Sequence, residues 1–106
     1  MSEKEFAEQI VREFRKRLEE VLNVPMRIIL YGSHARGEAT EGSDIDVFVI
    51  VPELDPQRDS LIGEVAWEIG FKAGVVLSVV PISEKELPML KESPFLQTVF
   101  KEGIVL

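Results

Sequence analysis

The chain has 106 residues, of which 45% are hydrophobic and 29% are charged, a composition typical of one globular domain over residues 1–106. It contains no cysteine and one histidine, which excludes disulfides, thiolate metal sites and any metal site that needs two imidazoles from one chain. The formal net charge of −7 disfavours binding of long nucleic acid, because phosphate contacts along a strand need a basic face.

The amino-terminal segment is charged and has no apolar run, so it lacks the pattern of a secretion signal. No stretch approaches the roughly 18 apolar residues that a membrane span requires. We therefore expect a cytoplasmic protein with no membrane partner. Its acidity does not exclude a small triphosphate, because backbone N–H groups, a metal ion and one or two cations can hold one.

The first predicted element is an amphipathic helix over residues 3–22. Ser2 and Glu5 have the Ser-x-x-Glu spacing of a capping box, which predicts where the helix begins. Apolar residues then recur at steps of three or four and should form one stripe that faces the core. These residues are Phe6, Ile10, Phe14, Leu18 and Val21. Asn23 and Pro25 are expected to end the helix.

Two apolar runs, residues 26–31 and 44–51, predict strands. The second is the strongest strand of the chain, and its apolar side chains on both faces predict a strand that is covered on both sides. Residues 32–43 between them are rich in Gly, Ser, Thr and charged residues. We expect a loop there, with a single helical turn after Ser33.

The second half of the chain begins with a helix from Asp55-Pro56 to about residue 72, in which Asp is the N-cap and Pro the first helical residue. Its inward stripe should consist of Leu61, Ile62, Val65, Ala66 and Ile69. Residues 75–80 predict a third strand, which Pro81 closes.

Two shorter helices are expected near the carboxyl end. Ser83 and Glu86 repeat the capping-box spacing and predict the first. Ser93-Pro94 predicts the start of the second, which Gly103 ends. Its inward residues should be Phe95, Val99 and Phe100. Residues 104–106 are apolar and form either a contact surface or a last edge strand.

The order of elements is therefore helix, strand, loop, strand, helix, strand, helix, helix. Each amphipathic helix must bury its apolar stripe against another element, and one small sheet offers the faces to do so. The sequence predicts an α/β (α+β) fold, a small mixed β-sheet with helices packed against it.

Asp44 and Asp46 stand two positions apart at the start of the strongest strand. Side chains alternate along a strand, so both carboxylates should point to one face. Two such charges repel unless a cation lies between them, and Mg²⁺ is often held by one or two carboxylates plus substrate phosphates. The alternative is a strand end whose two Asp residues face solvent or cap a turn.

Gly32 and Ser33 follow the first strand and precede the expected helical turn. Glycine lets a backbone approach a phosphate closely, the N–H groups after it favour an anion, and the serine hydroxyl adds a donor. The alternative is ordinary turn chemistry. Arg36 could bind phosphate oxygens or form a surface salt bridge with Glu38 or Glu41.

Two further side chains are assigned passive roles. His34 could contact a base or a phosphate, but a lone histidine in a polar loop is more often simply exposed. Trp67 lies beside the stripe of its helix and is expected to pack rather than to stack on a base.

The combination of these features is more specific than any one of them. The chain has these features in one order: a strand, then Gly-Ser, then a spacer of ten residues, then Asp-x-Asp at the start of an apolar strand. If the two strands are adjacent, the glycine turn and the acidic pair lie at the same end of the sheet. One site could then hold phosphates and the metal that bridges them.

This pattern resembles the signature of the DNA polymerase β nucleotidyltransferase superfamily. Ala35-Arg36-Gly37 and Ser43-Asp44-Ile45-Asp46 make the chain similar to the minimal nucleotidyltransferases of that superfamily. The motif covers about twenty residues, and the order of elements around it fits over most of the chain.

The resemblance implies transfer of a nucleotidyl group from ATP, with two Mg²⁺ ions on the triphosphate, an acceptor hydroxyl that attacks the α-phosphorus, and pyrophosphate as the leaving group. It makes Asp44 and Asp46 the catalytic metal ligands and Gly32 and Ser33 the residues that hold the β- and γ-phosphates. Further phosphate-binding candidates are Arg36 and Ser43. Minimal members often act beside a small all-helical partner of the HEPN type, as antitoxins that adenylylate a tyrosine of the partner.

The chain departs from the family pattern at one point. Active members usually carry a third carboxylate on a later strand, whereas the matching strand here has Ser78 as its only polar residue. A missing general base costs about 10²–10⁴ in rate. Glu84 or another acid could take its place in space.

Two functions therefore stay open. One is an active nucleotidyltransferase that modifies a protein hydroxyl, as the antitoxin of a HEPN-type toxin. The other is a catalytically degenerate nucleotide-binding module that acts by binding its partner. A polymerase fragment that binds polynucleotides is disfavoured by the charge of −7. The sequence does not fix the oligomeric state, and a homo-oligomer is compatible with it.

Overall fold

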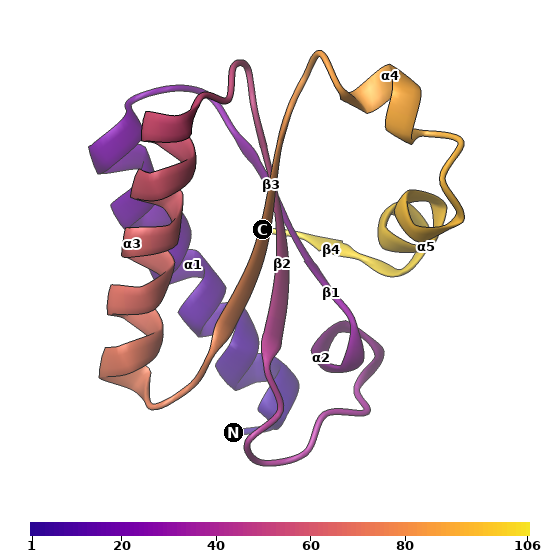
Figure 1. The fold of residues 1–106 in the computed structure, drawn as a ribbon. Coiled ribbons are helices and arrows are strands. Elements are labelled where there is room, and N and C mark those ends of the chain that lie inside the picture. Colours follow the sequence, from indigo (N-terminus) through magenta and orange to yellow (C-terminus); the bar gives the residue numbers. More distant parts are fainter.

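A four-stranded sheet forms the middle layer of the molecule, with helices on both of its faces (Figure 1). The computed structural model describes residues 1–106. Its elements are α1 Glu3–Leu22, β1 Arg27–Tyr31, α2 Ser33–Arg36, β2 Ile45–Val51, α3 Pro56–Ala73, β3 Leu77–Ser83, α4 Leu87–Leu90, α5 Pro94–Glu102 and β4 Ile104–Val105. This is the mixed α/β architecture that the order of elements predicts.

The strands lie in the order β3-β2-β1-β4, so β3 and β4 are the two edges of the sheet. β1 runs antiparallel to β2 and to β4, whereas β2 and β3 are parallel. A parallel pair needs a long crossover connection, and α3 supplies it. Of the two alternatives for residues 104–106, the edge strand is the one that forms.

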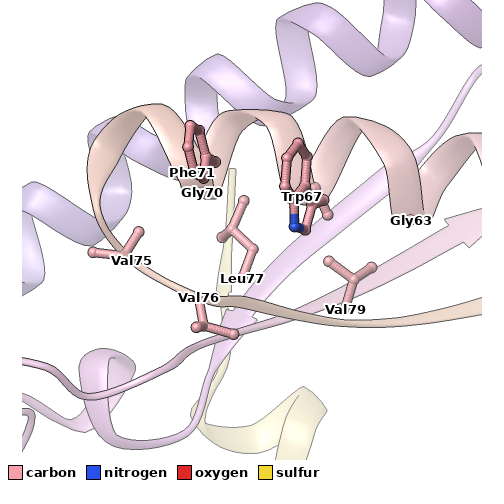
Figure 2. Close-up of a pocket in the computed structure, with 9 residues that line it drawn as sticks. Gly63, Trp67, Gly70, Phe71, Val75, Val76, Leu77 and Val79 are labelled. Atoms are coloured by element: carbon pink, nitrogen blue, oxygen red, sulfur yellow. The ribbon is translucent and has the colours of Figure 1, made fainter.

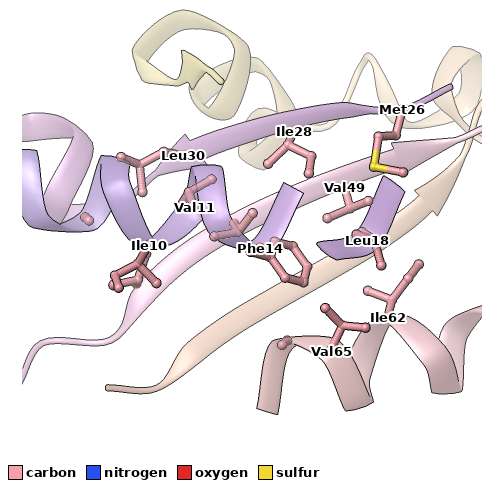
Figure 3. Packing of buried hydrophobic residues seen from close by; sticks show 14 of the residues in the cluster. Ile10, Val11, Phe14, Leu18, Met26, Ile28, Leu30, Val49, Ile62 and Val65 are labelled. Carbon is pink, nitrogen blue, oxygen red and sulfur yellow. The ribbon is translucent and has the colours of Figure 1, made fainter. Parts of the chain in front are cut away.

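α1 begins and ends where the sequence predicts. The Ser2 hydroxyl accepts a hydrogen bond from the Glu5 backbone N–H (3.1 Å), and the Glu5 carboxylate accepts one from the Ser2 backbone N–H (3.3 Å). Asn23 ends the helix in the left-handed conformation, with φ of 52°. α1 and α3 together cover one face of the sheet, and Figure 3 shows Phe14 and Leu18 of α1 packed among the residues of this core.

β2 is buried on both faces, as its composition predicts. The residues that face α1 and α3 are Ile45, Val47, Val49 and Val51. Phe48 and Ile50 face the other way and pack with residues of α4 and α5. Asp46 has the same strand parity as Phe48, so its carboxylate emerges on the side of the sheet that carries α5.

The third strand differs from its prediction. It spans Leu77–Ser83 rather than residues 75–80, and it continues through Pro81 instead of ending there. A proline fits because β3 is an edge strand, where a missing N–H leaves no ladder partner unsatisfied. Composition alone could not show that this strand lies at an edge.

The short helices also differ in detail. Because Ser83 lies in β3, the second capping box does not form, and α4 begins at Leu87 without a side-chain cap. On α5 the buried residues are Leu96 and Val99, whereas Phe95 and Phe100 are largely exposed. No helix of the molecule has both the length and the apolar character needed to cross a membrane.

Candidate active site

The end of β1 brings the glycine turn directly against the acidic pair. Tyr31, the last residue of β1, pairs with Asp46 of β2, and Gly32 follows Tyr31. A Cβ atom at Gly32 would collide with Oδ2 of Asp46 and would lie 3.1 Å from its Cγ. The φ angle of Gly32 is +78°, which favours glycine. The missing Cβ at Gly32 thus lets the Asp46 carboxylate lie directly against the backbone, and the two features do lie at one end of the sheet.

Ser33 begins α2, the single helical turn expected after the first strand. The turn is closed by hydrogen bonds from the Arg36 N–H to the Gly32 carbonyl (3.2 Å) and from the Glu38 N–H to the Ser33 carbonyl (2.9 Å). These bonds fix Gly32 and Ser33 as one rigid corner that follows directly from β1.

The carboxylates of Asp44 and Asp46 interact. Burial raises the pKa of Asp46, and repulsion from Asp44 raises it further, whereas attraction to His34 and Arg36 partly opposes both effects. A divalent cation between the two carboxylates would remove this repulsion. Oxygen ligands that leave room for phosphate oxygens are the set that Mg²⁺ prefers. Asp44 and Asp46, next to the Gly32 turn, therefore offer the carboxylate oxygens that Mg²⁺ with a bound triphosphate would need.

Arg36 lies on the surface of α2 in two ion pairs, with Glu38 (3.1 Å) and with Glu102 of α5 (3.6 Å). Of the two predicted partners, Glu38 is confirmed, and Glu102 takes the place of Glu41. Exposed ion pairs contribute little to stability because water and salt screen them. The guanidinium can therefore exchange these carboxylates for phosphate oxygens at little cost.

His34 is buried, with 2% of its surface exposed, so the predicted exposure is wrong. α2 directs both His34 and Ala35 inward, and Ala35 belongs to the core under α1 and α3. The Nδ1 atom of His34 has no hydrogen-bond partner. A four-residue helix is too short for apolar periodicity to reveal its inner face, which is why the sequence did not show this burial.

Ser43 makes its contacts within its own loop. Its Oγ accepts a hydrogen bond from the Thr40 N–H (3.1 Å) and lies 3.4 Å from the Thr40 hydroxyl. The side chain thus closes the turn that leads to Asp44. Phosphate binding by Ser43 stays a prediction.

The position opposite Asp46 on β3 is Ser78. The parallel register pairs Asp46 with Ser78 directly, so the two side chains point to the same face of the sheet. The structure contains no group of three His, Cys, Asp or Glu side chains that could hold a metal ion. Glu84 does not supply the third acid, because it follows the far end of β3, about 20 Å away along the strand, where it pairs with Arg27.

Tyr31 is a site residue that the sequence analysis missed. Its phenol is half-buried, and burial together with the nearby charge of Asp46 raises its pKa. Its ring packs edge-on against Phe95 (centroids 5.7 Å apart) and Phe48 (6.2 Å). The sequence feature that could have indicated this role is the position of Tyr31 as the last residue of the strand, directly before Gly32. Tyr31 adds a hydroxyl and an aromatic wall on the α5 side of the acidic pair.

The site is an open surface rather than a deep cavity. Neither Asp44 nor Asp46 borders any of the main grooves of the molecule, although Ser43 borders one of them. Small-substrate sites are usually concave and enclosing. The acidic pair therefore lies outside the enclosed grooves of the molecule.

Comparison with known proteins agrees with this geometry. The family model described as "Nucleotidyltransferase domain" matches residues 9–101. A protein of Methanocaldococcus jannaschii named "Putative protein adenylyltransferase" is 33% identical over 103 residues, which cover 97% of this chain and 92% of that protein. Another protein of the same organism and with the same descriptive name is 32% identical over 74 residues, which cover 68% of this chain and 75% of that protein.

Proposed function

The chain belongs to the nucleotidyltransferase domain family, and from this membership we propose that it transfers AMP from ATP, with Mg²⁺, to a hydroxyl group of a partner protein. The observation that carries the proposal is the Gly32 turn held against the carboxylate of Asp46, with the charge of Asp44 beside it. The names of the two Methanocaldococcus relatives support a protein as the acceptor.

Five residues of the site have a task in the proposed reaction. Asp44 and Asp46 hold Mg²⁺, and Gly32 and Ser33 receive the β- and γ-phosphates with Arg36 as the neighbouring cation. When bound, Mg²⁺ neutralises phosphate charge and acts as a Lewis acid on the phosphoryl oxygens. The acceptor hydroxyl forms a bond to the α-phosphorus, the bond to pyrophosphate breaks, and the hydroxyl proton passes to solvent or to a base of the acceptor.

The partner we propose is a small all-helical protein of the HEPN type, for which this chain acts as antitoxin. The support for it is the family resemblance of the motif and the open form of the site. The test is to incubate this chain with Mg²⁺, ATP labelled at the α-phosphate and a HEPN-type protein. Label on the partner is the expected result. No label on the partner, with label absent also from every protein of a native extract, would contradict the proposed transfer.

The alternative function is a degenerate module that binds nucleotide and partner without chemistry. The specific observation in its favour is Ser78, which stands at the one strand position directly opposite Asp46 where a third acid would complete the metal site.

Ser78→Asp is expected to raise the transfer rate by about tenfold or more, since restoring a missing general base can contribute about 10²–10⁴. The register places the new carboxylate on the same face as Asp46 and in the adjacent strand. The measurement is the single-turnover rate with α-labelled ATP. Ser78→Asn is the matched control, because it has the size of Asp without its charge. Equal rates for the two variants would show that a third acid is not what limits transfer.

A further inference from the structure

A second exposed feature lies where α3 crosses the start of β3, on the face of the sheet opposite to the Asp46 carboxylate. Trp67 and Phe71 of α3 are 68% and 72% exposed, and their rings stack with centroids 5.1 Å apart. Val76, just before β3, is 59% exposed. They border a groove of about 460 Å³ that is completed by Gly63, Ala66, Gly70, Val75, Leu77 and Val79 (Figure 2). We call these nine residues the aromatic patch.

The free edge of β3 runs along this patch. The Val76 carbonyl accepts from the Ile45 N–H (2.9 Å), and the Glu84 N–H donates to the Val51 carbonyl (2.8 Å), so even-numbered residues face β2. Backbone groups alternate in direction along a strand. Leu77 and Val79 therefore direct both N–H and C=O to the open edge, whereas Pro81 can offer only its carbonyl.

We propose that the aromatic patch and the β3 edge form a two-fold interface with a second copy of this chain. Leu77 of each copy pairs with Val79 of the other in an antiparallel ladder centred on Ser78. This arrangement uses every open donor of the edge before Pro81 and joins the two sheets into one of eight strands. The two-fold axis places both α3 helices on the same face, where their Trp67 and Phe71 rings meet. The inference is independent of the proposed transfer activity.

The size of the patch suits a self-associating surface. An uncovered aromatic side chain presents about 150–250 Å², so the three exposed residues of the patch offer roughly 400 Å² per copy. A standard interface buries about 800 Å² per partner. The β3 backbone and the rest of the groove supply the remainder. We therefore expect a dissociation constant on the order of 10 µM rather than a permanent dimer.

The aromatic patch is a surface on which a second copy meets no like charge. The patch contains no charged residue although 29% of the chain is charged, so two copies of net charge −7 can meet there without like charges in direct contact. β3 also lacks the charged residues that usually protect an edge strand from pairing. The edge is self-complementary, because two open residues flank Ser78 symmetrically, as a two-fold contact requires.

The test is sedimentation of the chain from about 1 to about 200 µM. Wild type should change from 12.0 kDa to twice that mass, and the double variant Trp67→Glu/Phe71→Glu should stay monomeric. Met89→Glu is the matched control, because Met89 is 78% exposed on α4 and outside the patch. The proposal would be overturned if wild type stays monomeric or if the double variant still forms the dimer. The aromatic patch would then be a contact surface for a different protein.

A cysteine placed at Ser78 tests the register itself, since the chain has no other cysteine. In the proposed ladder Ser78 faces its own copy across the axis, at a Cβ separation of about 4.5–5.5 Å that is close to disulfide geometry. Ser78→Cys should form a disulfide-linked dimer under mild oxidation much faster than Val105→Cys on the opposite edge. Equal cross-linking rates for the two variants would overturn the β3 pairing.

Discussion

Asp46→Asn is expected to lower the rate of AMP transfer by on the order of 10³ and to leave the protein folded. A metal that acts as Lewis acid contributes several kcal/mol of transition-state stabilisation, and a loss of about 4 kcal/mol corresponds to about a thousandfold. Asn has the shape of Asp but lacks the charge that holds the cation. The measurement is the initial rate with α-labelled ATP at saturating Mg²⁺, with Asp59→Asn on the exposed first turn of α3 as control.

The pH dependence of the stability of Asp46→Asn distinguishes an effect on catalysis from an effect on folding. The pKa of Asp46 is raised in the folded protein above its ordinary value of 3.8, first by burial and then by Asp44. A group of this kind contributes stability below its unfolded pKa and loses that contribution as pH rises through its folded pKa. With Mg²⁺ chelated, Asp46→Asn should therefore equal wild type near pH 3 and be the more stable of the two at neutral pH.

The thermal unfolding midpoints of both proteins across this pH range provide the measurement. If the variant is less stable than wild type at neutral pH, the Asp46 carboxylate makes favourable contacts within the folded protein and does not need a cation to offset its charge. Loss of transfer would then be a folding effect, and the metal assignment would lose its support.

Gly32→Ala is expected to impair both stability and nucleotide binding. The backbone there has φ of +78° and ψ of −155°, a region in which an L residue costs about 1–3 kcal/mol. The new Cβ also collides with Oδ2 of Asp46, which must move. We expect a lower unfolding midpoint and at least a tenfold loss of affinity for ATP with Mg²⁺, because a shift of the carboxylate disturbs the proposed cation site.

Gly37→Ala is the matched control for this variant. Gly37 has φ of +75°, but a Cβ there would meet no atom within 4 Å. It lies in the left-handed αL region, where an L residue is strained less than at Gly32, so the variant controls for a positive φ without the collision. Calorimetry with ATP and Mg²⁺ should show near-normal affinity for Gly37→Ala and weak affinity for Gly32→Ala. Equal affinities would show that the contact between Gly32 and the Asp46 carboxylate does not matter for binding of ATP with Mg²⁺.

Local patterns predicted most of the elements. The capping box of Ser2 and Glu5, the stripe of α1 and the Asp55-Pro56 start of α3 all form as expected, because each depends on residues within a few positions of one another. The double-sided burial of β2 follows from its own composition in the same way.

The errors share a different cause. Pro81 inside β3, buried His34 and exposed Trp67 each depend on what lies beside the segment in space. A proline is acceptable only at an edge, and a helix turn buries whichever side meets its neighbours. Propensity contains no information on either point.

By itself, the sequence determined the α/β class, the presence of the three longer strands and the identity of the residues in the Gly-Ser and Asp-x-Asp motif, since these follow from periodicity and spacing along the chain. Only the tertiary structure decided that β1 and β2 pair so that Gly32 meets Asp46, that Ser78 stands opposite, that Tyr31 flanks the pair, and that Glu84 is remote. The physical reason is register: one step of slip along a strand moves every side chain to the other face, and register is fixed by packing between distant segments.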